Sequence, residues 1–176
     1  MGLFILMQVS LAIYAFLMYG QKELKYFSFD SISVIFLTLL AFVSFASVWH
    51  GFGYLKSERT GRYNLYHTAL VILIVSISGA YLANDLTVMW IFIEATTLSV
   101  SVLIYHQRDE LALEATWKYI FICSTGIALA YMGILLLSMT IHGSEFSLSF
   151  ENLKATVLKA NPVYLKLAFI LVIVGF

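Results

Sequence analysis

Residues 86–105 read LTVMWIFIEATTLSVSVLIY, twenty consecutive residues in which Glu94 is the one charged side chain. A helix needs about twenty residues to cross the hydrocarbon core of a bilayer, which is about 30 Å thick. The stretch therefore predicts a transmembrane helix. Glu94 follows Leu86 by eight residues, about 12 Å along a helix, so its carboxyl group is expected near the middle of the membrane.

The same criterion, applied outward along the chain, predicts five complete spans and a shortened sixth. The complete spans are Gly2–Gly20, Ser31–Tyr54, Tyr66–Ala83, Leu86–Tyr105 and Leu113–Met139, and the shortened one is Val163–Phe176. We expect an all-α polytopic transmembrane helix bundle forming a single membrane domain over residues 1–176. Because the last span breaks off after about 21 Å, we also expect the chain to be a fragment of a longer subunit.

The composition supports a membrane protein and excludes several other classes. Hydrophobic residues make up 61% of the chain and charged residues 11%, whereas soluble domains have about 25% charged residues. A net charge of zero without a basic tract gives no reason to expect nucleic acid as a partner. One cysteine cannot supply a disulfide framework or an iron–sulfur centre. No catalytic motif is recognisable, so we expect neither cofactor nor metal, and no catalytic chemistry within this chain.

The short connections indicate how the spans are arranged. Asp30 is a candidate N-cap for the second span, and Asn84-Asp85 predicts a tight turn that makes the third and fourth spans antiparallel neighbours. The long connection between His142 and Pro162 predicts a short amphipathic helix at the membrane interface. The basic cluster from Lys56 to Arg62 favours the cytoplasm for its side of the membrane.

Two ionisable residues, Glu94 and Lys118, stand out inside predicted spans, where a charge is costly and often functional. On insertion scales each costs about 2.5 to 3.5 kcal/mol at the membrane centre. Glu94 and Lys118 lie on the two arms of a predicted antiparallel hairpin, at depths that differ by about 6 Å. A lysine side chain can reach over that distance, so a contact between them, direct or through water, is permitted.

Simpler interpretations exist for both residues. Lys118 stands four residues after Glu114, the spacing of a local helical ion pair, and could reach the interface with it. Glu94 could be a protonated acid that only joins two helices. Four histidines fall near the ends of predicted spans, where such side chains are usually solvated, and His67 and His106 are candidates for proton uptake or release.

The residues around this hairpin resemble a known family. The blocks NDLTVMW at 84–90, IEATTLS at 93–99 and LEATWKYI at 113–120, followed by Cys123, are similar to the hydrogenase-4 component F branch of the antiporter-like proton-translocating subunits. Related subunits occur in respiratory complex I and in multisubunit cation/proton antiporters. The resemblance covers about residues 29–176, and the chain then looks like the N-terminal portion of such a subunit.

The resemblance implies roles for these residues. Glu94 corresponds to the family's buried glutamate on its fifth helix, and Lys118 to the lysine on its sixth. The family's central lysine, on a broken seventh helix, would follow Phe176 and lies outside this sequence. The implied function is proton translocation by a non-redox membrane subunit of an oxidoreductase complex in the inner membrane. Its expected partners are the other membrane subunits of a hydrogenase-4-like or complex-I-like (NADH dehydrogenase) assembly, the lipid bilayer and protons.

Two alternatives remain at this point. A subunit of a multisubunit sodium/proton antiporter has the same fold and needs no redox chemistry. A structural membrane scaffold would use Glu94 and Lys118 only to hold two helices together, and replacing both by apolar residues would then change little.

Overall fold

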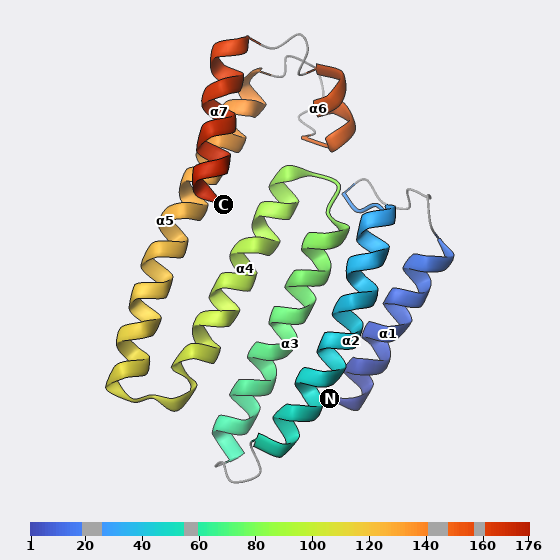
Figure 1. Cartoon of the computed structure of the whole chain (residues 1–176), viewed down its shortest axis with the longest axis vertical. Coiled ribbons are helices and arrows are strands. Elements are labelled where there is room, and N and C mark those ends of the chain that lie inside the picture. Colours follow the sequence, from blue (N-terminus) through green and yellow to red (C-terminus); the bar gives the residue numbers. More distant parts are fainter. Residues whose placement is uncertain (19–25, 55–59, 141–147, 157–160) are drawn as a thin grey trace.

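The computed structural model of the chain describes residues 1–18, 26–54, 60–140, 148–156 and 161–176, and its described elements are helices (Figure 1). Seven α-helices and one short 3₁₀-helix are found in this part of the chain. They are α1 (Gly2–Leu17), α2 (Ser31–Tyr54), α3 (Thr60–Leu82), α4 (Leu86–Ile104), η2 (Tyr105–Gln107, the 3₁₀-helix), α5 (Glu110–Thr140), α6 (Phe150–Thr156) and α7 (Pro162–Gly175).

The all-helical membrane architecture is confirmed, but the number of complete spans is not. Four described helices are long and apolar enough to cross a membrane, namely α2, α3, α4 and α5. The predicted first span, Gly2–Gly20, corresponds to α1, which ends at Leu17 and is 16 residues or about 24 Å long. The predicted sixth is α7, with 14 residues. Residues 19 and 20 of the first prediction lie outside the described residues.

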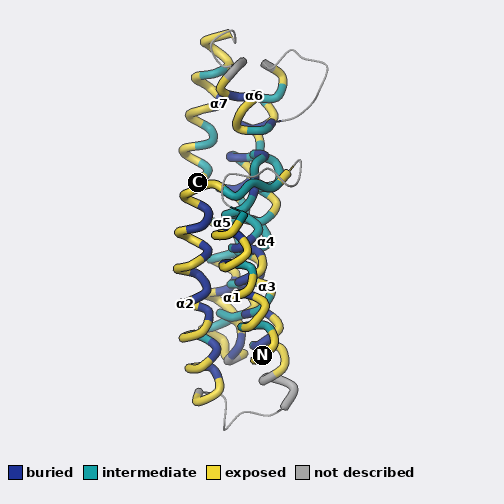
Figure 2. Tube along the Cα trace, turned by 90° about the vertical axis from the view of Figure 1, so that its right-hand side faces the viewer, coloured by how far each residue is buried: buried dark blue, intermediate teal, exposed yellow. Residues whose placement is uncertain are grey.

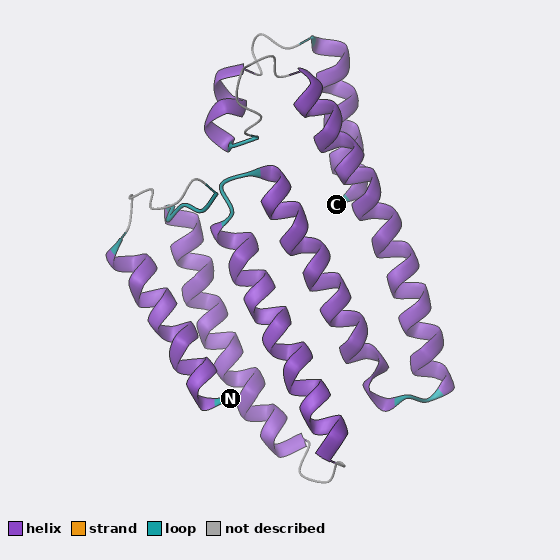
Figure 3. Ribbon diagram, turned by 180° about the vertical axis from the view of Figure 1, so that it is seen from behind, coloured by secondary structure: helices purple, strands orange, loops and turns teal. Residues whose placement is uncertain are grey.

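Helices α1 to α5 lie side by side in the order of the chain, each against the next (Figures 1 and 3). Seen from the side, the arrangement is narrow (Figure 2). A thin layer buries little of each helix, and only 11% of the spanning part of α4 is buried within the chain. Large apolar side chains such as Phe42, Trp49 and Phe121 are therefore exposed and need lipid or other membrane subunits as neighbours.

The turn between α3 and α4 is tight, as predicted, and two other segments pair with it. Asp85 caps α4 by accepting a hydrogen bond from the amide of Thr87 at 2.9 Å. Backbone bridges join Ala83 to Phe27 on one side and Asp85 to Ser149 on the other. This turn therefore connects the start of α4 to the segment before α2 and to the segment before α6. A short helix was predicted within residues 142–162. The structure has α6 there, and residues 142–147 and 157–160 lie outside the described part of the chain.

Helix α7 packs along the second half of α5 through small residues (Figure 1). A Cβ atom placed on Gly126 would lie 2.8 Å from the carbonyl oxygen of Gly175, and one on Gly133 would lie 2.8 Å from that of Ala168. Small residues let two helix backbones approach closely, which is how helices gain packing contacts in a membrane. Gly175, at the end of α7, thus lies at the level of Gly126 on α5.

Candidate functional site

Glu94 lies in the middle of α4, and one of its carboxyl oxygens has no partner. Atom Oε2 is buried and accepts no hydrogen bond from any described residue. An ionised carboxylate without donors is expensive to keep away from water, because its hydration is lost and nothing replaces it. Glu94 as a whole is half-buried, so the unsatisfied position is this one oxygen, which lacks a donor within the described part of the chain.

The contacts between α4 and α5 indicate what Glu94 faces. The indole N–H of Trp90 donates a hydrogen bond of 3.0 Å to the carbonyl of Ile127, and its ring stacks on Tyr131 with 4.4 Å between ring centroids. Nearer the turn that joins the two helices, Ser101 and Thr116 line one cavity of about 280 Å³. Glu94 is one helical turn past Trp90 and two before Ser101, so it lies on the face of α4 turned toward α5.

The antiparallel register places Glu94 at the level of a small-residue segment of α5. One helical turn from Ile127 toward the connecting turn is Cys123, which is half-buried and is followed by Ser124, Thr125 and Gly126. Small side chains at this level leave more room beside the carboxyl group than Leu or Phe would. The end of α7 arrives at the same level, because Gly175 lies against Gly126.

Lys118 and Glu94 do not form a direct contact in this structure. The ammonium of Lys118 instead pairs with Glu114, four residues earlier on α5, and the two side chains are 70% and 59% exposed. Thr116 faces α4 through the shared cavity. Lys118 is two residues further, about 200° around the helix, so it points away from α4. The similar depths of Glu94 and Lys118 permit a contact between them, but the face of α5 that carries Lys118 is turned away from α4. The ion pair between Lys118 and Glu114 forms instead.

His67 and His106 are brought together although they are far apart in the sequence. The ring of Tyr66 makes edge-on contacts with both, at centroid distances of 5.5 Å to His67 and 5.3 Å to His106. The Nε2 atoms of both histidines are buried. The expectation of solvated interfacial histidines is therefore wrong for these two, which are 5% and 7% exposed.

The remaining histidines behave differently. His50, near the end of α2, is exposed as expected, whereas His142 lies outside the described residues. Among the residues that the structure describes, no group of three or more His, Cys, Asp or Glu side chains is placed to hold a metal ion.

Sequence reasoning missed the contact of Trp90 with α5, since a tryptophan in an apolar run looks like one that faces lipid. Its sole detectable signal is the four-residue spacing from Glu94. Trp90→Phe keeps an aromatic ring but removes the hydrogen bond to Ile127. We expect the free energy of unfolding, measured in detergent by chemical denaturation, to fall by about 0.5 to 1 kcal/mol. Trp49→Phe is the matched control, because Trp49 is 74% exposed; equal effects of the two changes would contradict a stabilising role for this bond.

Comparison with known proteins supports the resemblance found in the sequence. Residues 83–176 match the model of the family "NADH:quinone oxidoreductase/Mrp antiporter, TM". The hydrogenase-4 component F homolog of Methylacidiphilum infernorum is 26% identical over 86% of this chain and 34% of its own length. The NADH-quinone oxidoreductase subunit N of Maricaulis maris is 27% identical over 85% of this chain and 30% of its own length.

A solved structure agrees with the fold. One chain of the membrane-bound sulfane sulfur reductase, an archaeal respiratory membrane complex, superimposes with a TM-score of 0.84. The two sequences are 21% identical. The superposition covers 97% of this chain and 37% of the reductase chain. This chain thus spans about a third of the length of these two curated relatives.

Proposed function

The chain belongs to the NADH:quinone oxidoreductase/Mrp antiporter transmembrane family, and from this premise we propose that it acts as a proton-translocating membrane subunit, or as the N-terminal part of one. Its partners in this proposal are the other membrane subunits of a hydrogenase-4-like or complex-I-like respiratory assembly, and its location is the inner membrane. The redox energy comes from those partners, since the proposal assigns no electron transfer to this chain.

The observation that supports this proposal most is the carboxyl group of the half-buried Glu94, whose atom Oε2 is buried and has no donor among the described residues. A carboxyl group that lies inside a membrane-spanning helix and forms no ion pair with a described residue is a candidate site for proton transfer. Moving one charge against about 150 mV costs about 3.5 kcal/mol. Breaking a buried ion pair costs about 3 to 5 kcal/mol, so forming and breaking such a pair at Glu94 has the magnitude that pumping needs.

Lys118 enters the proposal as the cationic group of the same hairpin, with Glu114 as the residue that holds it in the arrangement described above. His67 and His106, packed on Tyr66, are proposed to take up or release protons at their end of the bundle.

The role of Lys118 can be tested by substitutions that separate charge from proton release. Arginine keeps the positive charge and the pairing with Glu114 but does not deprotonate in proteins. If Lys118 passes protons on, Lys118→Arg should reduce proton translocation as strongly as Lys118→Met. If Lys118 serves only as the partner of Glu114, Lys118→Arg should translocate normally, and its part in proton transfer would be withdrawn. The measurement is acidification of proteoliposomes that contain the assembled complex.

The same proteoliposomes test the function as a whole. The proposal predicts that turnover of the redox partner acidifies one side of the membrane and that the rate is independent of sodium. The sodium/proton antiporter alternative, which the family match keeps open, predicts proton movement driven by a sodium gradient without any redox substrate. A complex that turns over without moving either ion would favour the structural scaffold and end the proposal.

A further inference from the structure

Trp90 joins the first half of α4 to α5 by two directional contacts. Its indole N–H donates a hydrogen bond of 3.0 Å to the carbonyl of Ile127, and its ring stacks on that of Tyr131 with 4.4 Å between the centroids. Ile127 and Tyr131 are four residues apart, so they lie on one face of α5. Apolar contacts are non-directional, whereas a hydrogen bond restricts both distance and angle. Trp90 therefore sets the depth and the rotation of α4 relative to α5.

The same side chain also contacts the part of the chain around α6. Trp90 packs against a buried cluster made of Ile134 on α5, Leu153 on α6 and Leu148, two residues before α6. Three segments that are far apart in the sequence therefore meet at one side chain of α4. A change in how they pack reaches α4 first at Trp90.

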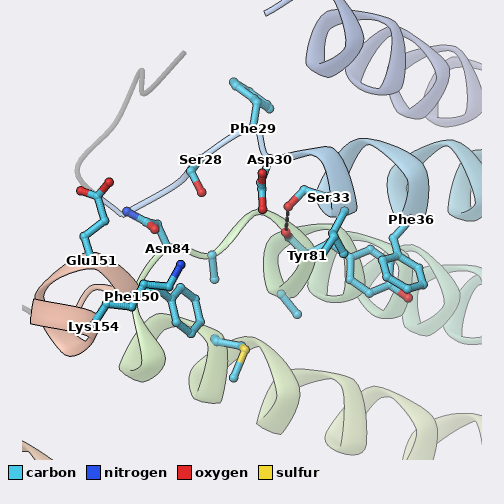
Figure 4. A pocket seen from close by; sticks show the side chains of 14 residues that line it. Ser28, Phe29, Asp30, Ser33, Phe36, Tyr81, Asn84, Phe150, Glu151 and Lys154 are labelled. Atoms are coloured by element: carbon cyan, nitrogen blue, oxygen red, sulfur yellow. Dashed lines mark hydrogen bonds between the residues drawn. The ribbon is translucent and has the colours of Figure 1, made fainter. Parts of the chain in front are cut away.

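Helix α6 is held at the start of α4 by the backbone as well. The amide of Phe150 donates to the carbonyl of Asn84 at 3.3 Å. Figure 4 shows both residues in the lining of a groove of about 590 Å³, which also includes residues of α2 and α3. The first turns of α4 are thus held by α6 through the backbone and by α5 through Trp90.

The contact made by Trp90 lies close to the level of Glu94. Glu94 follows Trp90 by four residues, about 6 Å along the same face of α4. The acceptor Ile127 directly follows Gly126, where a Cβ atom would lie 2.8 Å from the carbonyl oxygen of Gly175 at the end of α7. Neighbouring residues of α5 thus contact α4 and α7, and Glu94 lies about one turn away from them.

The position of the Glu94 carboxyl group depends on the helix that carries it. Its atom Oε2 accepts no hydrogen bond from a described residue, so no such bond holds this atom in place. Proton transfer requires donor and acceptor within about 2.6 to 3.2 Å of each other, directly or through one water. A displacement of about 1 Å is enough to slow such a step strongly. A contact that fixes α4 on α5 therefore bears directly on proton transfer at Glu94.

We propose that Trp90 is a positioning residue for Glu94. It holds α4 at the depth and rotation on α5 at which the carboxyl group exchanges protons, and it carries no proton itself. This inference rests on the proposed function, since it needs proton transfer at Glu94. Without the contact, α4 still packs on α3 and spans the membrane, but Glu94 is no longer held at one place relative to α5. The redox partner then turns over while fewer protons cross.

The test measures protons moved per turnover in proteoliposomes that contain the assembled complex. Trp90→Phe keeps a ring but removes the hydrogen bond to Ile127, and Tyr131→Leu removes the stacked ring. Each should lower the ratio about two- to tenfold, the factor by which losing one net hydrogen bond or one aromatic pair loosens a contact. Turnover of the redox partner, counted per assembled complex, should stay unchanged.

Two matched controls separate positioning from stability. Ser33→Ala also removes a hydrogen bond from a side chain to a backbone carbonyl of the next helix, the bond of 2.6 Å from the Ser33 hydroxyl on α2 to Tyr81 on α3. Tyr131→Phe keeps the ring that stacks on Trp90. Both should keep the wild-type ratio, because a loss of stability lowers the amount of assembled complex and not the protons moved by each complex.

The outcomes distinguish this inference from the proposed function. A wild-type ratio in both Trp90→Phe and Tyr131→Leu, or an equal loss in Ser33→Ala, would overturn the role of Trp90. If Glu94→Gln stops translocation while the Trp90 and Tyr131 variants keep the wild-type ratio, the proposed function stands and the positioning role alone is wrong. If Glu94→Gln translocates normally, both are wrong.

Discussion

Replacing Glu94 by glutamine is expected to abolish proton translocation while the complex still assembles. Glutamine has nearly the same shape and stays neutral, so it can occupy the same place on α4 without a new buried charge. It cannot carry a proton, and a positioned acid–base group contributes at least about 100-fold to proton transfer. The acidification rate of proteoliposomes should therefore fall to the passive leak during normal turnover of the redox partner.

A second carboxylate of the hairpin provides the control for this experiment. Glu110 begins α5 and is exposed, so Glu110→Gln should leave acidification unchanged. Glu94→Asp shortens the side chain but keeps the acid, and we expect partial activity from it. Normal acidification by Glu94→Gln would contradict the proposed function, whereas loss of assembly in that variant alone would indicate a structural role.

Gly133→Ala is expected to destabilise the packing of α7 on α5. Its new Cβ atom would lie 2.7 Å from Cγ2 of Val172, 2.8 Å from the carbonyl oxygen of Ala168 and 3.0 Å from the amide nitrogen of Val172. Two of these atoms belong to the backbone of α7, which cannot rotate away as a side chain can. Helix α7 must therefore move off α5, and overpacking of this kind costs about 1 to 3 kcal/mol.

Gly53→Ala is the matched control for this substitution. Gly53 is also helical, on α2, but a Cβ atom there would have nothing within 4 Å. Alanine is a better helix former than glycine by about 1 kcal/mol, so this variant should be neutral or more stable. Chemical denaturation in detergent gives both free energies of unfolding. Equal values for the two variants would mean that α7 does not pack on Gly133 as described.

The sequence was sufficient for the helices because each is a long apolar run bounded by polar residues. It predicted the limits of α2 and the short turn before α4 closely, since Asn84 and Asp85 separate two such runs. It placed the start of α3 six residues late, at Tyr66 rather than Thr60, because the polar first turns of that helix lie outside its apolar part. An apolar run marks the part of a helix in lipid and not where its hydrogen bonding begins.

The candidate site was harder to predict because its geometry depends on rotation and on contacts between distant segments. Depth along a helix can be counted from the sequence, and it placed Glu94 and Lys118 at similar levels. The direction in which Lys118 points depends on which face of α5 meets α4, and packing decides that. The same applies to His67 and His106, which are 39 residues apart and share a neighbour in Tyr66.

The backbone hydrogen bonds at the start of α4 also connect Glu94, through its own helix, to the segments before α2 and α6. The amide of Leu86 donates to the carbonyl of Leu148 at 3.3 Å, and that of Asn84 to Tyr26 at 2.8 Å. A displacement of α6 therefore pulls on the first turn of α4, and a rigid helix transmits that pull over the nine residues, or about 13 Å, from Asp85 to Glu94. A neighbouring protein that displaces α6 would thus change the position of Glu94 without contacting it.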